Sequence, residues 1–243
     1  MKTLITVLLG LLKAAKFSKF LLTGGTMLLS VFAYALVFGW WYAVGFVALI
    51  FVHEMGHFLA ARRRGLDVGA PTFIPFVGAW IQLKDMPHDA ETEAYVGIAG
   101  PIAGSIGACV VYLFAHSTGS QLLLALAYSG FMINLFNLIP LSPLDGGRVT
   151  AVISPRLWLV GVPLLAGLFL WRPSPLLILI AIMALPQVWA VMTGKLEETA
   201  AYYQASSRTR AVYAAQYLGL VLLLSIMSFE LYRQMHPGVE GSL

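Results

Sequence analysis

A predominantly apolar stretch at residues 40–61 is long enough to cross a lipid bilayer, and it contains His53-Glu54-Met55-Gly56-His57. A segment crossing hydrocarbon is restricted to a helix or a closed barrel, because only these satisfy every backbone hydrogen bond internally. On a helix, residues four apart share a face, so His53 and His57 can bind one metal ion with Glu54 beside them. Ionisable side chains in hydrocarbon are costly unless they serve a site, which predicts a metal centre inside the membrane.

The composition agrees with a membrane location. Of the 243 residues, 59% are hydrophobic and only 11% are charged, whereas soluble domains contain about 25% charged residues. The net charge of +4 is not a nucleic-acid-binding pattern, since the basic residues cluster at the ends of the apolar stretches. The single cysteine, Cys109, excludes an intrachain disulfide and a zinc site built from cysteines.

The chain divides into three expected regions. Residues 1–20 form a basic amphipathic segment on the cytoplasmic surface, residues 21–192 form the membrane-embedded core, and residues 193–243 add a polar linker and a further apolar helix. That last helix could pack in the bundle, lie in the interface or gate substrate entry. We therefore expect an all-α polytopic membrane protein with six to seven transmembrane helices. The candidate spans are residues 21–38, 40–61, 94–115, 122–139, 157–171, 176–192 and 211–231.

The distribution of positive charge predicts the orientation. With a cytoplasmic N-terminus, every Lys and Arg except Arg172 and Arg233 lies on the cytoplasmic side. The HEMGH motif then lies about 8–12 Å from the cytoplasmic end of its helix, at 1.5 Å per residue. We expect a multi-pass protein of a bacterial or archaeal cell membrane, with its active site toward the cytoplasm.

Residues 65–92 are unsuited to a spanning helix, because Pro71, Pro75, Gly78 and Pro87 interrupt them. Two short β-like runs, 72–76 and 79–83, predict a small hairpin that is associated with the membrane after the second span and helps to wall the site. An ordinary cytoplasmic loop is the alternative.

Catalytic zinc usually has three protein ligands and one position open to water, and the histidines supply two. Only two acidic residues lie deep in apolar segments, Glu54 and Asp145. We assign Asp145 as the third ligand and Glu54 as the base that takes a proton from water and returns it to the leaving amine. Metal binding lowers the pKa of a coordinated water from 15.7 to about 7.

The surroundings of Asp145 admit a second interpretation. Pro140 and Pro143 interrupt the fourth span, and Gly146-Gly147 allow close backbone approach. Ser142 could be the N-cap of a helix with Pro143 at its first position and Asp145 at its third, and both roles can hold together. Asn137 could hydrogen-bond a neighbouring helix, or it could bind the substrate backbone or the oxyanion.

Two motifs together resemble the site-2 protease family of intramembrane zinc metalloproteases, in residues 40–148. They are His53-Glu54-Met55-Gly56-His57-Phe58-Leu59-Ala60-Ala61-Arg62 and an NxxPxxxxDGG element from Asn137 to Gly147. Gly100-Pro101-Ile102-Ala103-Gly104 also looks like the family's glycine-rich stretch. The resemblance implies zinc ligation by His53, His57 and Asp145, catalysis by Glu54 and cleavage within or near a substrate's spanning helix.

The resemblance also bears on substrate handling. In this family the segment after the first motif forms a membrane-associated β-hairpin, which could pair with an unwound substrate strand. Many relatives carry a PDZ domain or paired CBS domains. The longest segment between spans here is about 30 residues, too short for either, so we expect the compact form.

The leading functional hypothesis is an intramembrane zinc endopeptidase with one zinc ion per chain. Its expected partners are a membrane-anchored protein substrate and the lipid bilayer, and no nucleic acid. The alternatives are a metal-ion transporter and a non-proteolytic metal-binding membrane scaffold. The sequence has no evident inverted repeat, which disfavours the transporter, and it retains all four presumed active groups, which disfavours the scaffold.

Overall fold

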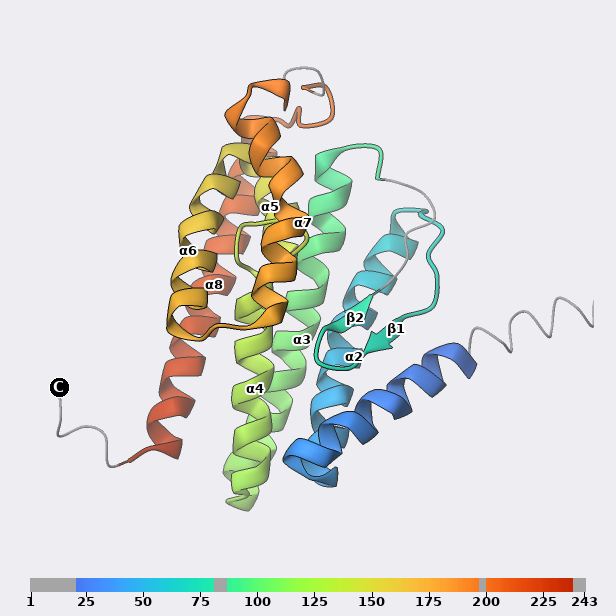
Figure 1. Cartoon of the computed structure of the whole chain (residues 1–243), viewed down its shortest axis with the longest axis vertical. Coiled ribbons are helices and arrows are strands. Elements are labelled where there is room, and N and C mark those ends of the chain that lie inside the picture. Colours follow the sequence, from blue (N-terminus) through green and yellow to red (C-terminus); the bar gives the residue numbers. More distant parts are fainter. Residues whose placement is uncertain (1–20, 81–86, 197–199, 238–243) are drawn as a thin grey trace, which may run out of the picture.

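The computed structural model describes residues 21–80, 87–196 and 200–237. The expected amphipathic segment at residues 1–20 lies outside them. The described residues form a helical bundle with a small two-stranded hairpin (Figure 1). The elements are a first helix Leu21–Phe38, α2 Trp40–Arg63, β1 Thr72–Ile74, β2 Gly78–Trp80, α3 Ala90–Thr118, α4 Gln121–Asn137, α5 Asp145–Ile153, η1 Pro155–Leu157, α6 Trp158–Trp171, α7 Pro175–Met192 and α8 Ser207–Met235.

The helices confirm the predicted all-α membrane fold. Among the described residues, five helices are long and apolar enough to cross a membrane: the first helix, α2, α3, α7 and α8. The fourth and fifth expected spans fall on shorter apolar helices, Gln121–Asn137 and Pro155–Trp171. The chain is thus an integral membrane protein, while the expected six to seven crossings stay a prediction.

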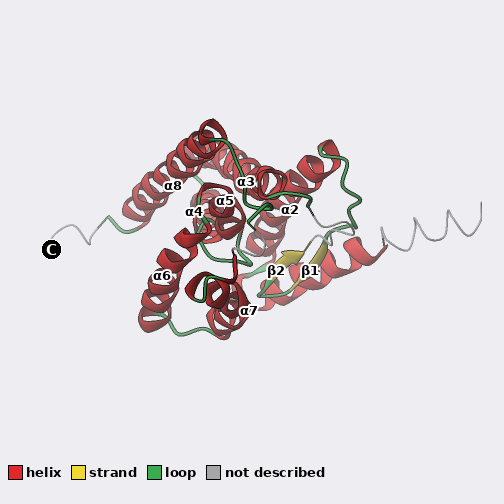
Figure 2. Cartoon of the chain, turned by 90° about the horizontal axis from the view of Figure 1, so that it is seen from above, coloured by secondary structure: helices red, strands yellow, loops and turns green. Residues whose placement is uncertain are grey.

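The centre of the bundle is built on α3, which packs against α2, α4 and α5. Seen from above, α4 and α5 lie at the centre of the bundle, among α3, α8, α6 and α7 (Figure 2). Small residues allow the close approach of α2 and α3, because a Cβ added at Gly56 would overlap the backbone oxygen of Ala99. Close contact through small residues is typical of helix packing in membranes.

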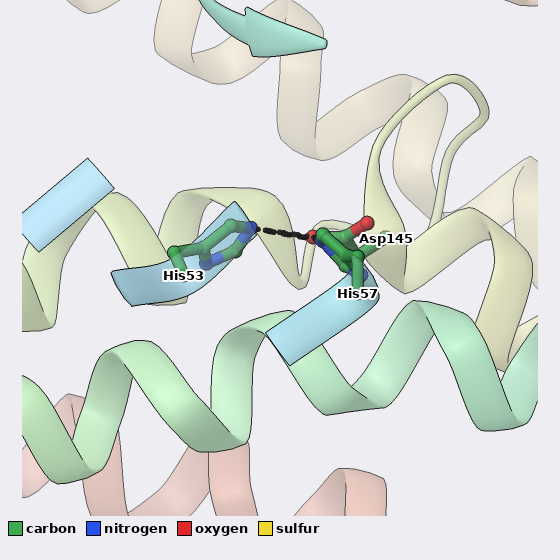
Figure 3. A group of neighbouring side chains, drawn as sticks. All are labelled: His53, His57 and Asp145. Atoms are coloured by element: carbon green, nitrogen blue, oxygen red, sulfur yellow. Dashed lines mark hydrogen bonds and ion pairs between the residues drawn. The ribbon is translucent and has the colours of Figure 1, made fainter. Parts of the chain in front are cut away.

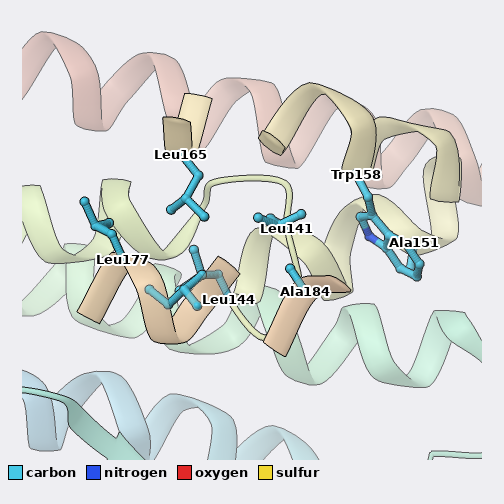
Figure 4. Close-up of a cluster of buried hydrophobic side chains, with 8 residues drawn as sticks. Leu141, Leu144, Ala151, Trp158, Leu165, Leu177 and Ala184 are labelled. Carbon is cyan, nitrogen blue, oxygen red and sulfur yellow. The ribbon is translucent and has the colours of Figure 1, made fainter. Parts of the chain in front are cut away.

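The chain between α4 and α5 is a folded turn region held by an apolar cluster. Leu141 and Leu144 from this turn pack with side chains of α5, α6 and α7 (Figure 4). Trp158 adds a polar contact, since its Nε1–H donates to Gly147 O at 2.8 Å. The members of the cluster are Leu141, Leu144, Ala151, Trp158, Leu165, Leu177, Ile180 and Ala184.

The seventh apolar segment, α8, is a bundle-packing helix that contacts α4 and α5. Leu224 and Leu231 are fully buried there. Tyr217 Oη–H donates to Leu138 O at 2.6 Å, and Arg210 Nη1 donates to Ile153 O at 2.7 Å. The helix therefore holds the turn before α5 and the C-terminal end of α5.

The predicted hairpin is confirmed, and the alternative of an ordinary loop is wrong. β1 and β2 are antiparallel, with Thr72 opposite Trp80, Phe73 opposite Ala79 and Ile74 opposite Gly78. The first strand ends at Ile74, before the expected end at residue 76, because Phe76 has a φ of 62° and belongs to the turn. Residues 81–83 of the second expected run lie outside the described part of the chain.

The hairpin lies between the first helix and α2. Hydroxyl groups of the first helix bind the β1 side: Thr26 Oγ1 accepts from Phe73 N at 3.2 Å, and Thr23 Oγ1 donates to Pro71 O at 2.7 Å. On the other side, β2 contacts α2. The outer edge of β1 is therefore occupied, and the hairpin packs against α2, the helix that carries the HEMGH motif, through β2 and through Phe73 of β1.

The chain before α8 is tied to the start of α3. Tyr202 O accepts from Ala90 N at 3.0 Å, and Tyr202 Oη–H donates to Glu93 Oε2 at 2.7 Å. Burial, followed by the nearby Glu93 carboxylate, raises the pKa of Tyr202 above its ordinary value. The phenol accordingly remains a donor at neutral pH.

Candidate metal centre

Three buried side chains from two helices converge on one point. His53 and His57 project from the same face of α2, and Asp145 is the first residue of α5 (Figure 3). His53 Nε2 and His57 Nε2 are 3.1 Å apart, and Asp145 Oδ2 lies 3.1 and 3.2 Å from them. The structure brings together the three residues that the sequence predicted as metal ligands, while ligation itself stays a prediction.

The far side of each imidazole is held by an oxygen. His57 Nδ1 lies 2.8 Å from Val96 O, a carbonyl that can only accept, so His57 carries a proton on Nδ1. His53 Nδ1 lies 2.8 Å from Asn134 Oδ1. Asn134 Nδ2 donates to Gly130 O at 2.6 Å, and this bond fixes which end of the amide faces the ring. His53 is therefore protonated on Nδ1 as well.

Because both imidazoles carry their proton on Nδ1, the atoms that meet at the centre are all hydrogen-bond acceptors. Both Nε2 atoms and the Asp145 carboxylate are then acceptors, and they face one another at hydrogen-bond distance. Buried acceptors at this separation repel unless a cation lies between them, either added protons or a metal ion. A tetrahedral zinc ion with bonds of about 2.0–2.1 Å places its ligand atoms about 3.3 Å apart, so this donor set fits zinc.

Glu54 lies beside this group on α2 and is buried, with 8% of its surface exposed. Within the described part of the chain, no side chain or backbone donor forms a hydrogen bond with its carboxylate. A carboxylate without a structural donor keeps its lone pairs available for a proton. Its position fits the predicted role as a base, and that role stays a prediction.

Glycines of α3 make room for the group. A Cβ at Gly100 would overlap the His57 imidazole, and a Cβ at Gly104 would overlap the Asn134 amide. These residues begin and end the Gly100-Pro101-Ile102-Ala103-Gly104 stretch singled out in the sequence. Glycine is required at both positions, because any side chain there would prevent α3 from approaching His57 and Asn134 so closely.

The helix that carries Asp145 begins later than the Ser142-Pro143 pattern predicted. The expectation of Ser142 as N-cap and Asp145 as third residue is wrong: the N-cap is Leu144, without a side-chain cap. Residues 140–144 are folded into turns, with Leu144 N donating to Leu141 O at 2.9 Å, so helix cannot start among them. Asp145 opens the helix instead, where the positive end of the helix dipole favours a carboxylate.

The predicted close approach at Gly146-Gly147 is observed. A Cβ at Gly146 would overlap the carbonyls of Leu138 and Ile139, and one at Gly147 would overlap Ser142 N. The turn region thus lies directly on the start of α5. This contact sets the position of the Asp145 carboxylate relative to α4.

The structure places Asn134, and not the predicted Asn137, against His53. Asn137 is the last residue of α4 and is partly exposed, outside the His53, His57 and Asp145 group. Its expected binding of substrate stays a prediction. Asn134, overlooked in the sequence, is 1% exposed and holds His53. The available signal was an amide within an apolar stretch, one helical turn before Asn137.

Comparison with known proteins matches residues 41–121 to the model of peptidase family M50. A zinc metalloprotease of Methanocaldococcus jannaschii is 31% identical over 120 residues, which cover 46% of this chain and 34% of that protein. Rip3 of Mycobacterium tuberculosis, named as a zinc metalloprotease, is 30% identical over 115 residues, 44% of this chain and 29% of that protein. The chain therefore spans about a third of the length of these relatives.

Among solved structures, a site-2 protease from Methanocaldococcus jannaschii aligns with 74% of this chain and 88% of its own, at 21% identity and a TM-score of 0.45. The matched family segment at residues 41–121 contains His53, Glu54 and His57, and it ends before Asp145.

Proposed function

We propose that this chain belongs to the site-2 protease family of zinc metalloproteases, and that it hydrolyses a peptide bond within or near the transmembrane segment of a membrane-anchored protein. One observation carries the proposal: three buried acceptor atoms converge beside a carboxylate that has no structural donor. Such a group requires a cation, and the family's metal is zinc. The buried setting suits a substrate that lies in the membrane.

In this proposal His53, His57 and Asp145 hold the zinc ion, and Asn134 and Val96 O fix the two imidazole tautomers. The bound ion supplies Lewis acidity and lowers the pKa of water to about 7. Glu54 takes the proton of the attacking water and returns it to the leaving amine. Burial of these groups strengthens each electrostatic contact relative to water.

The edge of β2 is the proposed docking site for the substrate backbone. Phe73 N–H points to Thr26, away from β2, so its partner Ala79 also directs its N–H and C=O outward in the alternating antiparallel pattern. The strand that carries this outward side contacts α2. An unwound substrate strand added there would lie beside the helix that carries His53 and His57, with its amides hydrogen-bonded.

The distribution of charge favours a cytoplasmic location for the upper end of the bundle in Figure 1. That end carries Arg62, Arg63 and Arg64 at the close of α2 and Arg208 at the start of α8, whereas Arg172 and Arg233 lie at the opposite ends of their helices. The positive-inside rule then places the N-terminus and the metal centre toward the cytoplasm of a bacterial or archaeal cell membrane.

The test is the Glu54→Gln variant of the purified chain with a model transmembrane substrate. We expect zinc content and thermal stability equal to wild type, and cleavage reduced by at least about 100-fold, since general base catalysis contributes that much. Cleavage at the wild-type rate would exclude the mechanism. Zinc flux into proteoliposomes without peptide hydrolysis would indicate the transporter, and zinc binding without either activity would indicate the scaffold.

A further inference from the structure

A groove separate from the metal centre lies where α2, α3 and α8 meet. Its volume is about 540 Å³, within the range of ligand sites. Figure 2 shows these three helices in succession along one side of the bundle. None of His53, Glu54, His57 or Asp145 lines it. The proteolytic site therefore does not account for this groove.

The deeper wall of the groove is apolar and open to the membrane. It is lined by Leu59 of α2, Ile102 and Ile106 of α3 and Val212 of α8. These side chains are 53%, 40%, 61% and 46% exposed. In a membrane-spanning bundle, such a surface contacts lipid acyl chains.

The rim of the groove, at the end of the bundle where α2 closes and α8 begins, is polar and basic. Arg63 lies in the last turn of α2, and Arg208 lies in the first turn of α8. Both are exposed, and neither guanidinium forms a hydrogen bond or ion pair with any residue the structure describes. Arg208 is also at the positive end of its helix dipole, where a cation is unfavourable unless an anion accompanies it.

We propose that this groove binds an anionic phospholipid, with its phosphate between Arg63 and Arg208 and an acyl chain against Ile102, Ile106 and Val212. The charges of the rim support a singly charged headgroup, because Glu91 also lines it and leaves one net positive charge. Glu91 can accept hydrogen bonds from the glycerol hydroxyls of phosphatidylglycerol. Basic pockets between helices at the cytoplasmic membrane surface are suited to such headgroups.

The bound lipid would connect α2 with α8. Arg63 ends the helix of His53 and His57, and Arg208 begins the helix that holds the turn before Asp145 through Tyr217. A phosphate bridging the two arginines would fix α2 relative to α8. We therefore expect the lipid to stabilise the fold, whether or not the chain is active.

The experiment uses the full chain in detergent micelles, with dioleoyl phosphatidylglycerol added and dioleoyl phosphatidylcholine as the comparison. Native mass spectrometry counts bound lipid, and tryptophan fluorescence follows thermal unfolding. We expect one tightly bound phosphatidylglycerol and a Tm rise of about 3 °C at ten times its Kd. The double variant Arg63→Gln/Arg208→Gln should bind about 5-fold more weakly for each arginine removed.

Two single variants test whether lipid binding depends on the groove itself or only on positive charge at this end of the bundle. Arg62→Gln removes a positive charge at the same helix end, but Arg62 packs over the Phe58 ring and does not line the groove. It should keep the wild-type affinity. Val212→Trp fills the apolar wall without changing charge, and it should weaken lipid binding by a similar factor to the double variant.

Equal affinity of the double variant and wild type for phosphatidylglycerol would overturn the proposal. Equal stabilisation by phosphatidylethanolamine would also overturn it, since the ammonium group of that lipid could pair with Glu91 and no anionic headgroup would be selected. Stabilisation by glycerol phosphate alone would show that the acyl wall has no role. Photocrosslinking of a substrate helix at residue 106, undiminished by excess phosphatidylglycerol, would assign the groove to substrate instead.

Discussion

Asn134 Oδ1 accepts a hydrogen bond from His53 Nδ1 over 2.8 Å, and the Asn134 amide is itself fixed by Gly130 O. An amide oxygen held in this way dictates which imidazole nitrogen remains free to bind a metal. The bond links α4 to α2 at the depth of the HEMGH motif, so the helix that precedes Asp145 also orients the first histidine.

Asn134→Leu should weaken zinc binding by about 10–100-fold, the usual effect of losing a partner that orients a ligand histidine. Chelator competition with a zinc-sensitive dye measures this affinity directly. Asn137→Ala is the matched control, three residues along the same helix, and it should keep wild-type zinc affinity while reducing kcat/KM if Asn137 binds substrate. Unchanged zinc affinity in Asn134→Leu would remove its orienting role.

Gly100→Ala should disrupt the centre, because its methyl group would overlap the His57 ring. Overpacking of this kind costs about 1–3 kcal/mol, and here the displaced group is a proposed ligand. Both Tm and zinc content should fall. Gly219→Ala on α8 has no heavy atom within 4 Å of the new Cβ and should be neutral or stabilising. Full zinc occupancy in Gly100→Ala would show that the ring has other room.

Ala79→Pro should reduce kcat/KM for a transmembrane substrate by about 3–10-fold, the value of one net hydrogen bond. Proline removes the outward N–H of β2 but leaves the ladder to β1, and edge positions tolerate it. Ala79→Val keeps the N–H and serves as the control. Identical kinetics for the two variants would exclude strand addition at β2.

Tyr217→Phe should destabilise the protein by about 1–3 kcal/mol, because the carbonyl of the buried Leu138 loses its donor. Denaturant or thermal unfolding in micelles measures the change. Tyr232→Phe, on the same helix with a 41% exposed side chain, should have little effect. If both variants unfold alike, the Tyr217 bond does not hold the turn.

The sequence was most informative where chemistry alone restricts position. Four ionisable groups lie in apolar segments, His53, Glu54, His57 and Asp145, and the three of them predicted as metal ligands do meet in the structure. Asn134 escaped notice because its partner depends on the rotational register of α4 against α2, which is set by packing between helices distant in the chain. The start of α5 was misplaced for a related reason, since turns stabilised by neighbouring helices outweighed the local preference of Ser142-Pro143 for a helix start.

The carboxylate of the centre lies on a nine-residue helix whose C-terminal end is hydrogen-bonded to α8, as is Leu138 at the start of the turn region before it. Because α8 is synthesised long after both histidines, a chain still emerging from the ribosome already possesses every proposed ligand but lacks the α8 contacts to the turn region and to the end of α5. We therefore expect the metal centre of such a nascent chain to stay incompletely assembled until α8 has been added.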